Sequence, residues 1–258
     1  MKGKLKRIYL LIAVGLMGTL TAQKRFEDFS ISMPEQKLDK SYYKTIKLID
    51  ARIDTTSLGI VQKGAFNAKA KVVPATSLAN QFQNLLNHIN GDQTENGTIV
   101  MYLKQLYFAE LTGAFSEHGY CYFQAYLFAK NDDDTYTYLS EMDSVIDHSS
   151  MDVTKAVMKK GSEMISNFIS KNISVKAQAT DYYTFDDLKN FDNIEKQKLS
   201  LYNSTELTNG FYKDFNSFKN QNPEKEITNV TFSTPEKITK IYGIVNLIYI
   251  YYICKKNI

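Results

Sequence analysis

The sequence predicts an α+β protein in which an antiparallel or mixed β-sheet carries two helices on one face. Three extended runs, residues 45–53, 98–108 and 120–139, are rich in β-branched and aromatic side chains. Two further segments, 78–89 and 153–169, place their apolar residues on one side at helical period. Both apolar stripes are buried if both helices lie on the same face of the sheet.

The first strand and first helix have clear boundaries in the sequence. The strand at 45–53 ends in the turn cluster Asp54-Thr55-Thr56-Ser57, and an extended segment follows at 58–64. We expect the helix at 78–89 to begin at Thr76 or Ser77, whose hydroxyl can accept a hydrogen bond from a first-turn N–H. Gly91 is placed to end that helix in a left-handed conformation.

For the second half of this domain, the sequence predicts a long central strand, a hairpin and a helix. The strand at 98–108 is followed by extended segments at 120–129 and 135–139, which an Asn-Asp-Asp-Asp turn joins. On the second helix, Gly161 lies on the apolar face, which favours close packing against the sheet. Residues 41–173 therefore have the predicted order β-β-α-β-β-β-α.

The whole chain divides into five predicted segments. A signal peptide is expected first and a polar tether second, and a polar linker separates the sheet domain from a small C-terminal α/β module. That module ends in an apolar run, 244–253, which indicates either a buried strand or a truncated or frame-shifted terminus. The segments are 1–22 (signal peptide), 23–40 (tether), 41–173 (sheet and two helices), 174–200 (linker) and 201–258 (module).

The first segment is typical of a secretory signal. Four basic residues precede an apolar run at 8–17, and cleavage is expected after Ala22 or Thr21. The alternative is an uncleaved anchor, but the run is shorter than the roughly 20 residues of a bilayer span. We therefore expect a periplasmic or secreted protein without a transmembrane span in the mature chain. No cysteine near the cleavage point can receive a lipid.

Net charge excludes one class of partner. The chain has 31 basic and 28 acidic residues, and the four basic residues of the signal segment account for its positive balance. The remaining chain is close to neutral, so it has no overall field that attracts nucleic acid.

Cysteine and histidine positions do not predict a catalytic, cofactor or metal site. Cys121 and Cys254 can pair in an exported protein, although the apolar run around Cys121 favours a buried free thiol. Glu117, His118 and Cys121 have no standard zinc spacing. Asp147-His148-Ser149-Ser150 combines acid, base and hydroxyl, but its serines are better placed to cap the second helix. We expect no cofactor.

Two other features stand out. Asp50 and Arg52 point to the same side of a strand just before a turn, which favours a structural ion pair that anchors the turn. Tyrosine is abundant along the predicted hairpin, where an aromatic ladder either stabilises the sheet or forms a recognition face. The members of this set are Tyr120, Tyr122, Tyr126, Tyr136 and Tyr138.

Residues 43–170 resemble a known family. The sequence contains, in order, a strand that ends Ile49-Asp50-Ala51-Arg52, the pair Leu58-Gly59, a Leu-rich helix, a long strand and a hairpin. This order is similar to that of small α/β envelope lipoproteins of Gram-negative bacteria. That family includes auxiliary components of ABC-type lipid-transport systems. Its members carry a lipid on an N-terminal cysteine, which this chain lacks. The string at 209–220 resembles a segment of uncharacterised exported bacterial proteins.

These observations lead to three expectations of function. The first is an exported, non-enzymatic envelope protein that binds a protein or lipid-linked partner. The second is a hydrolase with a dispersed site that uses Asp147, His148 or Glu117. The third is a surface adhesion module that uses the tyrosine-rich face.

Overall fold

The computed structural model describes residues 26–226 apart from 64–66, 114–115, 151–152 and 179–180. The chain divides into two compact units, Met1–Phe185 and Asp186–Ile258. The predicted signal peptide and the apolar run near the C-terminus lie outside the described residues. No helix in the described part of the chain combines the length and apolar character that a bilayer crossing needs.

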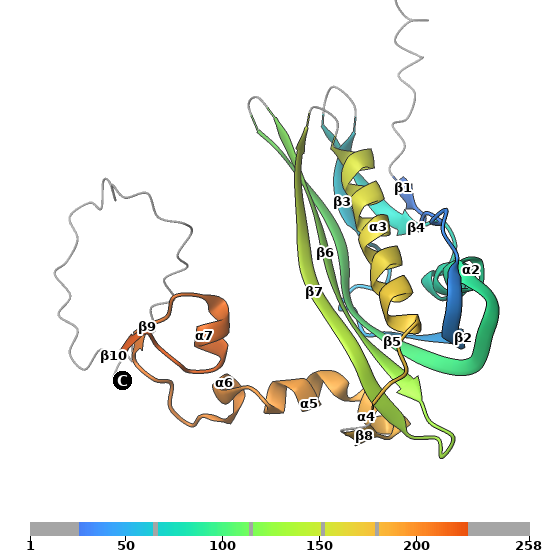
Figure 1. The fold of residues 1–258 in the computed structure, drawn as a ribbon. Helices are drawn as coiled ribbons and strands as arrows, with labels where there is room; N and C mark the ends of the chain where they lie inside the picture. Colours follow the sequence, from blue (N-terminus) through green and yellow to red (C-terminus); the bar gives the residue numbers. More distant parts are fainter. Residues whose placement is uncertain (1–25, 64–66, 114–115, 151–152, 179–180, 227–258) are drawn as a thin grey trace, which may run out of the picture. The chain divides into compact units, whose positions relative to one another are not determined.

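The first unit is built on one mixed sheet of eight strands (Figure 1). Its strand order is β1-β4-β3-β5-β6-β7-β8, and β2 also pairs with β5. Neighbours β5, β6 and β7 run antiparallel, whereas β2 and β3 run parallel to β5. The strands are β1 (Phe26–Phe29), β2 (Leu38–Asp50), β3 (Gly59–Lys63), β4 (Ala68–Pro74), β5 (Asn90–Thr112), β6 (Glu117–Lys130), β7 (Tyr136–Ser150) and β8 (Tyr182–Tyr183).

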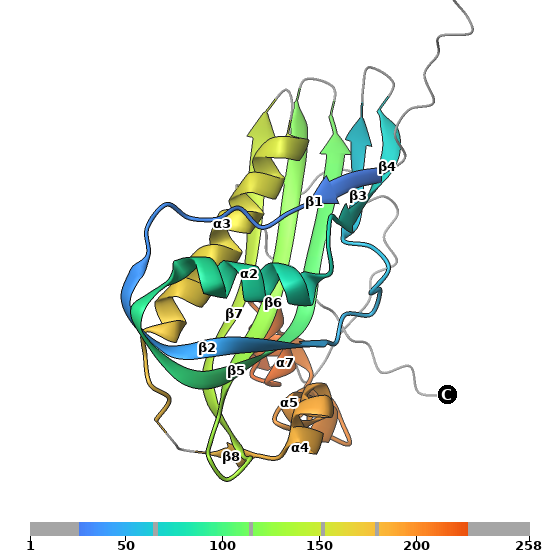
Figure 2. The ribbon, with the colours of Figure 1, turned by 90° about the vertical axis from the view of Figure 1, so that its right-hand side faces the viewer.

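Both long helices cover one face of this sheet, which confirms the predicted fold class (Figure 2). Helix α2 (Leu78–Ile89) begins at Ser77, whose hydroxyl accepts a hydrogen bond from the Asn80 N–H at 3.3 Å. Helix α3 (Thr154–Ile173) follows β7. The apolar residues of both helices join the strands in one buried core, as their helical period predicts.

Gly161 explains how α3 lies so close to the sheet. A Cβ atom at this position would lie 2.7 Å from the Cys121 sulfur and 3.0 Å from the Phe108 ring. Any side chain larger than hydrogen would push the helix away from β5 and β6. The predicted close packing is therefore observed.

Two predicted helix boundaries are wrong. Gly91 does not cap α2, because β5 begins at once with Asn90 in an extended conformation. Gly91 instead permits close approach of the Leu38 carbonyl of β2. Ser149 and Ser150 do not cap α3 but belong to β7, and the residue that precedes α3 is Val153, which makes no side-chain cap hydrogen bond.

The described part of the predicted tether, from Phe26 onward, belongs to the domain instead. Strand β1 pairs in parallel with β4, and Phe29 and Ile31 are buried in the core. The sequence also predicted no strand at β4, where alanine and lysine alternate. Both strands lie on the same side of β3, so the sheet is wider than expected.

The predicted linker, 174–200, contains ordered elements. Strand β8 pairs with β7 and belongs to the first unit, and α4 (Phe185–Lys189) and α5 (Phe191–Gln197) follow. The second unit therefore begins earlier than expected.

Short elements make up the described part of the second unit. Strands β9 (Gly210–Phe211) and β10 (Lys225–Glu226) pair antiparallel, and α6 (Ser200–Asn203) precedes them. Helix α7 (Phe215–Lys219) begins with a capping box in which Asp214 accepts from the Ser217 N–H. The Tyr212 ring packs edge-on against Phe218 at 5.2 Å.

Candidate functional site

The two faces of the sheet differ in what covers them. On β6, Cys121, Phe123 and Ala125 alternate toward the helices and lie in the core. Tyr120, Tyr122 and the residues that alternate with them point to the opposite side, which we call the open face. In the described part of the first unit, neither long helix lies on this face.

Strand register brings residues from six strands into one row across the open face. Paired residues in adjacent strands place their side chains on the same side of the sheet, so each row is a line of neighbours. The longest row runs Phe26 (β1), Lys71 (β4), Ile60 (β3), Ala109 (β5), Tyr120 (β6), Asp147 (β7). A second row joins Tyr107, Tyr122 and Val145, and a third row joins Leu111, His118 and Ser149.

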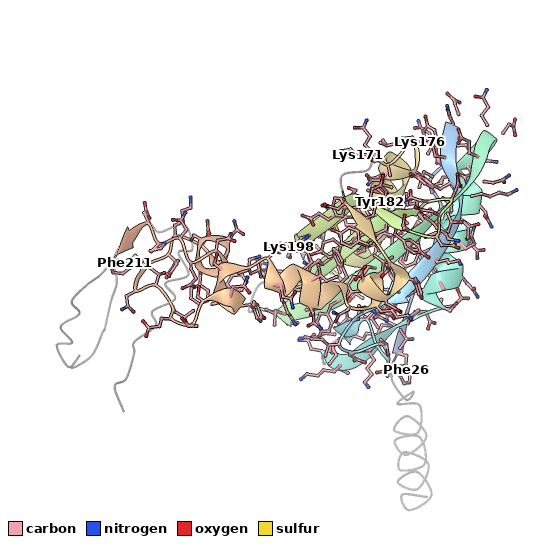
Figure 3. The ribbon with its side chains drawn as sticks, turned by 90° about the horizontal axis from the view of Figure 1, so that it is seen from below. Phe26, Lys171, Lys176, Tyr182, Lys198 and Phe211 are labelled. Atoms are coloured by element: carbon pink, nitrogen blue, oxygen red, sulfur yellow. The ribbon has the colours of Figure 1, made fainter. Side chains whose placement is uncertain are left out.

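Several large apolar side chains of these rows are exposed to solvent. Single exposed apolar residues are ordinary, but a contiguous set marks an interaction surface. They come from β3, β5 and β7 and from the edge strand β1, whose Phe26 is labelled in Figure 3. Their exposed fractions are 49% for Phe26, 40% for Ile60, 38% for Tyr107, 61% for Leu111 and 52% for Val145.

Charge changes sign across the open face. Lys69 and Lys71 are exposed on β4, and together with Phe26 and Ile60 they line a shallow hollow of about 380 Å³. Asp143 and Asp147 are exposed on β7, four strand positions away in the sheet order β4-β3-β5-β6-β7. The face is therefore basic at β4, aromatic in the middle and acidic at β7, and the exposed Asp28 of the edge strand β1 lies beyond the lysines.

The predicted tyrosine face is divided by burial. Tyr120 and Tyr122 stack with ring centroids 6.3 Å apart and are half-buried on the open face. Tyr126 and Tyr136 are each only 6% exposed. Tyr138 packs edge-on against Phe128 at 6.0 Å. Solvent therefore reaches mainly the end of the tyrosine set that lies near Tyr120.

Asp50 and Arg52 form a bidentate ion pair. The Arg52 Nε lies 2.8 Å from Asp50 Oδ1, and Nη2 lies 2.7 Å from Oδ2. Arg52 Nη1 also donates to the Ser57 carbonyl at 2.9 Å. These contacts fasten the turn that follows β2, and nothing in them marks a ligand site.

That turn is further ordered by Asp54. Its carboxylate accepts hydrogen bonds from the Thr56 hydroxyl at 2.6 Å and from the Ser57 hydroxyl at 2.8 Å. Hydrogen bonds from Thr56 and Ser57 to the charged form lower the pKa of Asp54 to about 2. The carboxyl group therefore stays ionised at physiological pH and serves the turn.

A buried carboxylate joins three elements at the end of the helix-covered face. Glu110 of β5 accepts a hydrogen bond from the Thr154 hydroxyl at 2.6 Å, where α3 begins. Glu110 also accepts from the backbone N–H of Gln62 in β3 at 3.2 Å. The sequence did not single out this residue, because nothing local shows that a lone Glu in a strand faces a helix terminus.

The predicted hydrolase residues do not converge. Register places His118 and Asp147 on the open face, whereas Glu117 and His148 point to the helix-covered side. His118 Nδ1 lies 3.7 Å from Asp147 Oδ1, and its Nε2 lies 3.4 Å from the Ser116 hydroxyl. The His118 and Asp147 side chains are 42% and 61% exposed, so water is not excluded from this cluster.

The possible metal ligands are also separated. Cys121 is a free, buried cysteine on the helix-covered side, and burial raises the pKa of its thiol to about 12. At the hairpin tip, Asp133 accepts from the Thr135 hydroxyl and Asp134 pairs with Lys130. Within the described residues, no three His, Cys, Asp or Glu side chains are grouped to hold a metal ion. Cys254 lies outside them.

Comparisons with known proteins identify no family. No protein-family model and no curated protein matches the chain. One similar solved structure is protein XCC0632 from Xanthomonas campestris, of the family DUF330. It is 5% identical with a TM-score of 0.33, and the match covers 56% of this chain and 90% of that one. A likeness at this TM-score carries no argument about function.

Proposed function

We propose that the chain is an exported, non-enzymatic envelope protein that binds a protein or lipid-linked partner on its open face. The observation that carries this proposal is the exposed apolar set on that face, because a contiguous apolar surface on a folded domain gains free energy when a partner covers it. Aromatic residues in its middle and charged residues at its sides match the anatomy of a protein interface.

Sequence features support the location of the partner. The cationic and apolar N-terminal segment is typical of a secretory signal, and the chain resembles envelope lipoproteins of Gram-negative bacteria. Export to the periplasm or to the outside would place the open face among envelope components.

Site-specific photo-crosslinking tests the proposal. A benzophenone amino acid replaces Tyr107 on the open face or, as the control, Lys159 on the solvent side of α3. Irradiation of expressing cells should give a crosslinked product from position 107 and none from position 159. Equal products at both positions, or none at 107, would contradict binding through the open face.

A hydrolase is the second candidate, because the sheet brings together the Ser116 hydroxyl, the His118 imidazole and the Asp147 carboxylate. The Ser116–His118 and His118–Asp147 distances exceed those of a formed catalytic hydrogen-bond chain, although such hydrogen bonds often shorten when substrate binds. A fluorophosphonate probe tests this candidate. Labelling that is lost in Ser116→Ala but kept in Ser174→Ala would support hydrolysis, and no labelling would remove it.

A further inference from the structure

We propose that the partner held by the open face is a second copy of this chain, packed face to face about a two-fold axis parallel to β5. The inference rests on the proposed function, because it uses the same surface. It goes further by naming the occupant. Three properties of the face carry the argument: the place of β5 in the sheet, the positions of its charges and the sizes of its central side chains.

Strand order makes the face self-complementary. In the series β4-β3-β5-β6-β7, β5 lies in the middle with two strands on each side. A two-fold axis parallel to the strands, midway between two facing sheets, exchanges the two sides. Strand β4 of one copy then lies over β7 of the second copy, β3 lies over β6, and β5 lies over β5. Two twisted sheets pack in this aligned manner about 10 Å apart.

Charges match under this operation. Lys71 and Asp147 occupy the same row, two strands from β5 on opposite sides. This axis keeps each residue at the same position along the strands and reverses its position across the sheet. Lys71 of each copy therefore faces Asp147 of the other copy. Two equivalent ion pairs result. An axis perpendicular to the strands would instead place β4 over β4 and bring like charges together.

Apolar side chains match as well. In the same row, Ile60 of β3 lies over Tyr120 of β6 in the second copy. Ala109 lies on the axis, where its small side chain allows the two β5 strands to approach. Tyr107 and Leu111, two positions to either side of Ala109, fill the space along the axis.

The area is sufficient for a reversible dimer. Five strands at about 4.8 Å spacing and seven residues at about 3.3 Å give a face of roughly 500 Å² per copy. The pair then buries roughly 1,000 Å², which is near the lower limit of specific protein interfaces. We therefore expect dissociation on dilution rather than a permanent dimer.

A charge-swap experiment tests the axis. Sedimentation velocity of the whole chain, as it accumulates in expressing cells, should show a monomer–dimer equilibrium. K71E puts a carboxylate opposite Asp147 twice per dimer, and D147K puts an ammonium group opposite Lys71 twice. Each variant alone should dimerise at least about tenfold more weakly. A mixture of the two should dimerise within about threefold of the original chain, because both pairs are attractive again.

A control variant and three outcomes complete the test. K159E changes an exposed charge on α3 and should leave dimerisation unchanged. A chain that is monomeric at every concentration, or a mixture that does not recover dimerisation, would overturn the proposal. If the chain is monomeric but the crosslinker at position 107 captures another envelope molecule, the proposed function stands and only the second copy is wrong. If position 107 captures nothing, both fail.

Discussion

The helix-covered face and the open face are made by the same strands, yet they have different environments. Along β6, Phe123 is fully buried under α3, whereas Tyr122 beside it in sequence is half-exposed on the other side. The period of two in a strand thus separates residues that hold the fold from residues that meet a partner. Substitutions of neighbouring residues should therefore act on different properties: stability on one face and association on the other.

Thiol reactivity should show the largest contrast. In a C254S background, Cys121 is the sole native thiol, and burial raises its pKa from 9.0 to about 12. A thiol placed on the open face by Y107C keeps an ordinary pKa, so at pH 8 it has about a thousandfold more thiolate. Reaction with a chromogenic disulfide should be fast for the Y107C thiol and negligible for Cys121 until the chain unfolds. Similar rates in the native protein would contradict the burial of Cys121.

Truncation of an aromatic side chain should separate the two faces next most strongly. Phe123→Ala removes a buried ring that packs edge-on against Phe168 at 5.8 Å, and it should lower the free energy of unfolding by about 3–5 kcal/mol. Tyr107→Ala on the open face should lower it by less than about 1 kcal/mol. Urea denaturation measures both losses. Comparable losses would mean that the open face is covered within the monomer.

Overpacking under α3 should have a smaller effect. Gly161→Val places atoms against the Cys121 sulfur and the Phe108 ring, so it should destabilise by about 2 kcal/mol. Lys160→Val, at the exposed neighbouring position of the same helix, should cost well under 1 kcal/mol. Thermal unfolding of the two variants gives the comparison, and equal melting temperatures would argue against a close helix–sheet contact.

Loss of one buried hydrogen bond should have the smallest effect. Thr154→Val keeps the side-chain shape but removes the hydroxyl that donates to the Glu110 carboxylate, so it should cost about 1.5 kcal/mol. Thr55→Val, in the exposed turn after β2, is the matched control and should be neutral. Urea denaturation of both variants is the measurement. A neutral Thr154→Val would show that Glu110 does not depend on this donor.

Local signals in the sequence predicted the helices well and the sheet edges poorly. The apolar period of α2 and the hydroxyl of Ser77 act within a few residues, and both are observed. Strand β1 has four residues, and β4 alternates alanine with lysine, which have low strand propensity. Strand β1 forms because the distant β4 supplies its hydrogen bonds, and β4 lies between β1 and its hairpin partner β3.

The open face was predictable only in part for the same reason. The tyrosines of one hairpin are visible in the sequence, but their burial is not, since Tyr126 contacts Tyr102 of another strand. The row from Lys71 to Asp147 depends on the register of five strands, which no local pattern specifies. Ser149 and Ser150 failed as helix caps because pairing with β6 extends β7 through them.

Strand β5 has two successive neighbours along one of its edges. Strand β2 occupies the first stretch, and at its end the Ala51 N–H donates a hydrogen bond to the Leu103 carbonyl. Strand β3 occupies a later stretch, where the Phe108 N–H donates a hydrogen bond to the Leu58 carbonyl. The crossover between them, which the Asp50–Arg52 pair fastens, therefore acts as a spacer of fixed length. A one-step slide of the β3–β4 block would turn Val61 and Val72 out of the core, so the turn itself has to absorb an inserted residue, at the expense of the Asp50–Arg52 and Asp54 contacts that hold it.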